Sequence, residues 1–166
     1  MTADAANLPE SSWEAVLSRR LPLLGHRNWI VVADAAYPAQ CAAGVTTILA
    51  DADQLNVIRK VLAAIAASGH VKAKILTDRE LSFVSEQDAP GIGEYRAKLV
   101  DLLRWSDVRT TPHEEIIERL DHAAARFEVL IIKTRLTIPY TSVFLELDCA
   151  YWNESAEARL RATMGE

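Results

Sequence analysis

The segment GVTTILADADQLNVIRKVLAAIAASGHVKAKILT, residues 44–77, contains a strand, a helix and a second strand in succession. Residues 44–50 form a short apolar run rich in β-branched side chains, which is typical of a buried strand. Apolar residues then recur at helical spacing from Leu55 to Ile65, and Gly69 ends the helix. Residues 71–77 alternate between apolar and polar side chains, as a strand with one wetter face does.

The flanking sequence continues this alternation. Further strands are predicted at residues 29–34, 128–134 and 141–147, and further helices at 11–21, 95–103 and 112–127. The last of these helices opens on a capping box, residues 111–114, with proline at its first helical position. We therefore predict one α/β domain over residues 1–166, a three-layer α/β/α fold with a largely parallel or mixed sheet, and residues 1–10 as a loose tail.

Composition and charge argue against some classes of protein, among them nucleic-acid-binding and membrane proteins. The chain has 166 residues, of which 50% are hydrophobic, and a net charge of −5, so the clustered positive charge that nucleic acids and anionic membranes require is not expected. No uncharged run is long enough for a membrane span, and the first residues lack the pattern of a signal peptide. We expect a cytoplasmic protein that binds a small neutral ligand or a partner protein.

Familiar catalytic and cofactor motifs do not occur. The sequence has no GxGxxG, no GxxxxGK[ST], no GxSxG and no HExxH, and its acidic pairs fall where helices begin, which capping explains first. A scattered polar set remains as the candidate site: His26, Asp34, His113, Tyr140 and Ser142.

His26 precedes the predicted strand at residues 29–34, and Asp34 closes that strand. Side chains just beyond strand ends are where open α/β sheets usually bind ligands. Each also has a simpler interpretation: Asp34 caps the turn before Pro38, and His26 is a surface or packed histidine.

His113 falls in the first turn of a predicted helix, where the amide groups and the helix dipole disfavour a positive charge. A neutral imidazole there can accept one hydrogen bond and donate another. Tyr140 and Ser142 are two residues apart at the start of a predicted strand, so we expect them on one face, where they could bind one polar ligand. The simpler interpretations are an exposed first turn and an exposed strand end.

Three segments together resemble one protein family. Leu24–Pro38 carries Gly-His, a short apolar strand and Asp-Ala before a proline; residues 112–115 read Pro-His-Glu-Glu; and residues 139–145 read Pro-Tyr-Thr-Ser before an apolar strand. In this order they resemble the ribose pyranase and fucose mutarotase (RbsD/FucU) family over roughly residues 12–150.

The resemblance implies an α/β fold, closed rings that are typically decamers, and sites between adjacent subunits. It also implies interconversion of the cyclic forms of unphosphorylated monosaccharides without cofactor or metal. On this basis we expect His26 as the principal acid/base and Asp34 as a catalytic residue that orients it or holds a sugar hydroxyl. His113, Tyr140 and Ser142 are expected as substrate-binding residues. Three positions depart from the family pattern: Ser142 stands where asparagine is usual, and Arg135-Leu136 replaces Gly-Glu.

The distance between His26 and Asp34 leaves two arrangements open. An extended chain would hold residues eight apart roughly 26 Å from each other. Either the segment around Gly25 and Asn28 curls back, or the two residues come from neighbouring subunits.

The departures also leave two other functions open. One is a sugar-binding or regulatory ring without turnover. The other is an isomerase or lyase that acts on a different polyol or a sugar acid, with Arg135 binding a carboxylate.

Overall fold

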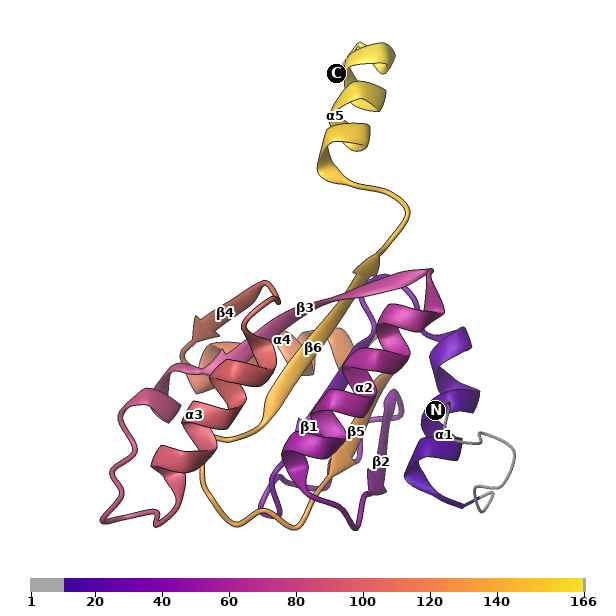
Figure 1. Ribbon diagram of the computed structural model, residues 1–166. Helices are drawn as coiled ribbons and strands as arrows, with labels where there is room; N and C mark the ends of the chain where they lie inside the picture. The colour runs from indigo at the N-terminus through magenta and orange to yellow at the C-terminus, as the bar shows by residue number, and fades with distance from the viewer. Residues whose placement is uncertain (1–10, 166) are drawn as a thin grey trace, which may run out of the picture.

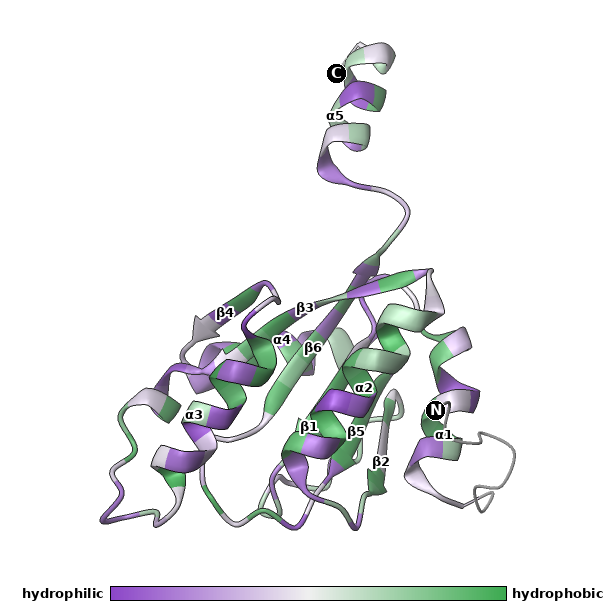
Figure 2. Ribbon diagram, viewed as in Figure 1, coloured by the Kyte–Doolittle hydropathy of each residue, from purple (hydrophilic) through white to green (hydrophobic). Residues whose placement is uncertain are grey.

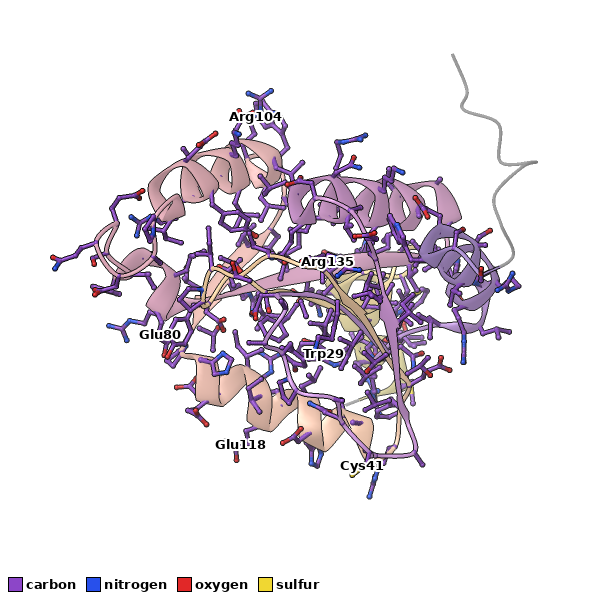
Figure 3. The ribbon with its side chains drawn as sticks, turned by 90° about the horizontal axis from the view of Figure 1, so that it is seen from below. Trp29, Cys41, Glu80, Arg104, Glu118 and Arg135 are labelled. Carbon is purple, nitrogen blue, oxygen red and sulfur yellow. The ribbon has the colours of Figure 1, made fainter. Side chains whose placement is uncertain are left out.

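The structure is a computed structural model that describes residues 11–165; the tail predicted at residues 1–10 lies outside them. A single six-stranded sheet lies between two layers of helices, as Figures 1 and 3 show. One face is covered by α1 (Trp13–Arg20), α2 (Gln54–Ser68) and α3 (Ile92–Leu103), and the other by α4 (His113–Ala124). The predicted three-layer α/β/α domain is confirmed.

The sheet is mixed. Its strands are β1 (Trp29–Ala33), β2 (Val45–Leu49), β3 (Val71–Asp78), β4 (Val108–Thr111), β5 (Val129–Lys133) and β6 (Val143–Cys149), in the order β2-β5-β1-β6-β3-β4. All neighbouring pairs are parallel except those of β6, which runs antiparallel to both β1 and β3. The start of β6 therefore lies at the same edge of the sheet as the ends of the other strands.

The core has two halves, one on each face of the sheet. Every residue of β1 is buried, and successive side chains alternate between the faces. Ile30 and Val32 pack with α1, α2 and α3, whereas Val31 and Ala33 pack with α4. Figure 2 shows this continuous apolar character along β1 and β5. Burial on both faces explains why the central strands are short apolar runs.

Predicted helix ends are partly confirmed. Gly69 ends α2 with a φ of 71°, as predicted. The side chains of Ser12 and Asp53 cap the starts of α1 and α2. The capping box predicted for α4 is wrong: Pro112 is the N-cap, and no side chain within that segment caps the helix. The same helix ends at Ala124, so its predicted extension to residue 127 is also wrong.

Several short elements were not predicted. They are β4, the 3₁₀ turns η2 (Leu21–Leu23) and η3 (Arg79–Ser82), and the terminal helix α5 (Glu154–Met164). No residue of α5 is buried, and Figure 1 shows this helix standing away from the sheet beyond the end of β6. Within residues 11–165, no helix is both long enough and apolar enough to cross a membrane.

Candidate functional site

Four of the five predicted site residues gather at one edge of the sheet, the edge that faces the viewer in Figure 3. Asp34 follows the end of β1, and His113 opens α4 just after β4. Tyr140 and Ser142 come just before β6, whose antiparallel direction brings its start to this edge. The mixed topology therefore places side chains from three distant parts of the sequence together.

Asp34 and Ser142 are joined by two hydrogen bonds. The Ser142 hydroxyl donates to Asp34 Oδ2 at 3.0 Å and accepts from the Asp34 amide at 3.2 Å. The other carboxylate oxygen, Oδ1, accepts from the Ala36 amide at 2.9 Å. Asp34 thus caps the turn after β1, and the carboxylate is also held in a defined direction at the sheet edge.

His113 is held by two acidic residues, Asp78 at the end of β3 and Glu80 in the 3₁₀ turn η3 that follows. Its Nδ1 lies 3.0 Å from Asp78 Oδ1, and its backbone amide donates to the Glu80 carboxylate at 3.0 and 3.2 Å. Figure 3 shows Glu80 beside the first turn of α4. The sequence interpretation considered only the helix terminus around His113, whereas the structure adds two carboxylates to its surroundings.

Tyr140 lies in a turn and not in a strand. Its φ is 58°, and β6 begins only at Val143, so the prediction that Tyr140 and Ser142 share a strand face is wrong. The left-handed turn instead directs Tyr140 to His113. The two rings pack edge to face, with their centroids 5.6 Å apart. Tyr140 is 40% exposed and Ser142 is buried, so only the phenol is open to a ligand from solvent.

A buried polar network fixes the segment between β5 and β6. Gln54 Nε2 donates to the Thr141 carbonyl at 2.7 Å and to the Tyr95 hydroxyl at 3.0 Å. Gln54 Oε1 accepts from Thr134 at 2.6 Å, and Tyr95 donates to the same Thr141 carbonyl at 2.9 Å. Gln54 therefore joins both ends of this segment and supports the turn that carries Tyr140.

Two buried polar atoms near the cluster have no hydrogen-bond partner among the described residues: Tyr37 Oη and Asp78 Oδ2. Burial raises the pKa of Tyr37, and the charges of Asp121, Asp78 and Asp34 raise it further. Burial also raises the pKa of Asp78, against the opposing effect of its hydrogen bond to His113. Unpaired buried groups of this kind are what a polar ligand or a bound water would satisfy.

His26 lies at the opposite edge of the sheet from Asp34. Residues 25–28 do form a turn, in which the Asn28 amide donates to the Gly25 carbonyl, but His26 stays beside the end of β6. There its Nδ1 lies 2.9 Å from Asp148 Oδ1, and its side chain is 56% exposed. About 13 Å of strand β1 separates the two edges. The curl of the chain therefore does not bring His26 to Asp34 within one subunit.

The sequence profile of the RbsD / FucU transport protein family matches residues 12–149. The chain belongs to this family. The matched region holds all five predicted site residues and ends before α5 begins. No curated protein sequence matches the chain.

Solved structures of the RbsD/FucU type have the same fold. Bacillus subtilis RbsD complexed with D-ribose is 20% identical, with a TM-score of 0.55 over 86% of this chain and 98% of its own. The fucose mutarotase of Streptococcus pneumoniae in complex with L-fucose is 21% identical, with a TM-score of 0.55 over 87% and 98%. FucU from Bifidobacterium longum is 13% identical, with a TM-score of 0.53 over 85% and 98%.

Sequence reasoning on this RbsD/FucU chain missed the supporting residues of the site. Asp78 and Glu80 fall in a polar stretch that resembles an ordinary strand end, and Gln54 resembles a surface residue at a helix start. Only the structure shows that Asp78 and Gln54 are 1% and 2% exposed. Among the described residues, no group of three or more His, Cys, Asp or Glu side chains could hold a metal ion.

Proposed function

We propose that this protein is a monosaccharide mutarotase or pyranase whose site is completed between subunits. The observation that carries the proposal is the division of the candidate residues between two edges. Asp34, His113, Tyr140 and Ser142 gather at one edge, whereas His26 is half exposed at the other. A second copy that places its His26 against this cluster would complete the site around one sugar.

The chemistry needs only proton transfer. Opening a cyclic hemiacetal removes the proton of the anomeric hydroxyl, adds a proton to the ring oxygen and breaks the bond between that oxygen and the anomeric carbon. The resulting aldehyde recloses on either face or through another hydroxyl, so the cyclic forms interconvert with no net change in atoms or electrons. General acid–base groups can each accelerate such steps by roughly 10²–10⁴-fold, and no cofactor is required.

Each residue has a distinct role in this proposal. His26 is the principal acid and base, because an imidazole can both give and take a proton near neutral pH. Asp34 orients His26 or a sugar hydroxyl through its carboxylate. The buried Ser142, expected from the sequence to contact the sugar, instead holds that carboxylate in place. His113 and Tyr140 hydrogen-bond the hydroxyls of an uncharged sugar, for which several neutral donors and acceptors are the matching chemistry.

The environment of His26 supports a site shared between copies. His26 borders an open hollow of about 620 Å³ whose wall includes Trp29, Arg119 and His122. The predicted assembly is a closed ring, such as a decamer, of a cytoplasmic protein. A ring repeats the same contact at every subunit, so each copy contributes both halves of a site.

The activity test is NMR saturation transfer between anomers and ring forms, run on a panel of free aldoses that includes ribose and fucose. We expect the wild-type protein to accelerate exchange of at least one sugar, and His26→Ala to abolish that acceleration. No acceleration with any aldose, or full activity in His26→Ala, would refute the proposal.

Mixed assemblies test whether the site is shared. Co-expressed His26→Ala and His113→Ala chains are expected to regain about a quarter of the sites, because some contacts pair an intact His26 with an intact His113. The matched control mixes His113→Ala with Tyr140→Ala, which damage the same half and should regain nothing. Equal recovery in the two mixtures, or recovery in neither, would contradict the shared site.

A sugar-binding ring without turnover is the second candidate. It is favoured by Ser142, which is buried and whose hydroxyl is already engaged by Asp34. Binding of a sugar without acceleration of its exchange would identify this function. The sugar-acid alternative has less support, since the guanidinium of Arg135 is paired with Asp51 at 2.6 Å.

A further inference from the structure

A buried carboxylate lies directly behind the His113 ring. Asp78 is the last residue of β3 and is 1% exposed, whereas the His113 side chain is 31% exposed. Asp78 Oδ1 lies 3.0 Å from His113 Nδ1, and Asp78 Oδ2 has no partner among the described residues. The buried Asp78 carboxylate therefore affects a ligand only through its contact with the His113 ring.

We propose that Asp78 is a positioning residue: it holds His113 with the proton on Nδ1, so that Nε2 faces the ligand as a hydrogen-bond acceptor. The inference rests on the proposed function only for its consequence on sugar exchange. The arrangement of the two side chains stands without it.

Three contacts restrict His113 from different directions. Glu80 accepts from its backbone amide, Asp78 contacts Nδ1, and the Tyr140 ring lies edge to face against the imidazole. Within residues 11–165, Nε2 has no hydrogen-bond partner. A ring that is fixed at Nδ1 and free at Nε2 presents one nitrogen to whatever occupies the site.

The direction of the hydrogen bond follows from the chemistry of Asp78. When Asp78 is ionised it can only accept, so Nδ1 donates, and in the neutral ring Nε2 then carries the lone pair. Burial and the nearby charges of Glu80 and Asp34 raise the pKa of Asp78, and the hydrogen bond with His113 counteracts them. The hydrogen bond from the His113 N–H thus replaces part of the hydration that Asp78 loses when it is buried.

The consequence for the proposed reaction is a defined acceptor for one sugar hydroxyl. Without the carboxylate the ring is free to carry its proton on Nε2, which turns an acceptor into a donor at the ligand. Loss of a partner that orients a functional histidine typically lowers activity by about 10–100-fold in comparable metal sites.

The first test is a long-range ¹H–¹⁵N spectrum of the histidine rings of the wild-type protein over a pH titration. The chain has four histidines, and His113→Gln assigns the signal of His113. We expect the neutral His113 ring to carry its proton on Nδ1. A neutral ring with the proton on Nε2 would overturn the proposal without any variant and without any measurement of activity.

The second test compares two variants with the same change of charge. Asp78→Asn is expected to lose the Nδ1–H signature and to slow sugar exchange by about 10–100-fold. Glu80→Gln is the matched control for the ring signal, because Glu80 accepts from the backbone amide of His113 and not from its ring, so the Nδ1–H signature should stay. Equal effects of the two variants on the ring signal would contradict a role specific to Asp78. If the wild type exchanges no sugar while the Nδ1–H signature is present, the proposed function fails and the positioning role stands.

Discussion

Ser142 and Asp34 exchange hydrogen bonds across the edge of the sheet, although 108 residues separate them in the sequence. The serine hydroxyl donates to the carboxylate at 3.0 Å and accepts from the amide of the same aspartate at 3.2 Å. One small side chain therefore satisfies two polar groups of Asp34. The pair joins the end of β1 to the start of β6 and fixes the carboxylate that the proposed site uses.

Ser142→Ala is expected to destabilise the protein by about 1–2 kcal/mol, because it leaves a carboxylate oxygen and an amide without their partner. It should also weaken sugar binding, since the Asp34 carboxylate is then free to turn. Urea unfolding at a fixed chain concentration measures the first effect and NMR titration the second. The control is Thr163→Ala, which removes an exposed hydroxyl that bonds a carbonyl in α5. A loss no larger than that of the control would contradict the role of the pair.

Gln54→Leu is expected to cost about 2–3 kcal/mol, because Thr134, Tyr95 and the Thr141 carbonyl all lose a hydrogen-bond partner inside the core. Sugar exchange should fall as well, because the turn that carries Tyr140 loses its support. Chemical denaturation and saturation-transfer NMR provide the two measurements. Gln87→Leu makes the same chemical change at an exposed position and should leave both quantities nearly unchanged.

The part of the site that could be predicted from sequence depends on strand ends. Asp34 follows a short apolar run, and the rule that ligands bind beyond strand ends made it a candidate. His113 was identifiable because it opens a strongly periodic helix. Both signals are local in the sequence, so no knowledge of the tertiary structure was needed.

The remaining features depend on contacts between distant residues. The period-2 rule assumes an extended backbone, and it failed at Tyr140 because this residue adopts a φ of 58°. Asp78 and Gln54 are polar side chains whose burial comes from elements that pack over them, which periodicity does not reveal. The role of His26 stays a prediction, because it concerns a contact between two copies of the chain.

Asp148→Asn is expected to lower stability near neutral pH and to have little effect in acid. The hydrogen bond from Lys74 lowers the pKa of Asp148, and the Cys149 amide and His26 lower it further. A carboxyl group with a lowered folded-state pKa contributes stability above its unfolded pKa and loses it as the pH falls through the folded value. Because Asp148 is partly exposed, the difference should stay below about 1 kcal/mol. Denaturant unfolding of both proteins at neutral and acidic pH measures it.

The control for this comparison is Asp51→Asn, which removes one partner of an exposed ion pair with Arg135. It should change stability little at either pH. A deficit of Asp148→Asn that persists unchanged in acid would show that the side chain acts through packing and not through its charge.

Gly44→Ala is expected to destabilise the protein by about 1–3 kcal/mol, because the segment just before β2 lies against the end of α4. An added Cβ would lie 2.6 Å from the Ala124 carbonyl oxygen and 2.8 Å from that of Phe127, and neither backbone atom can move without displacing the helix end. Gly25→Ala is the matched control, because nothing lies within 4 Å of the added carbon. The two variants should therefore differ clearly in thermal and urea unfolding. Equal stabilities would contradict the close approach of the end of α4 to the start of β2.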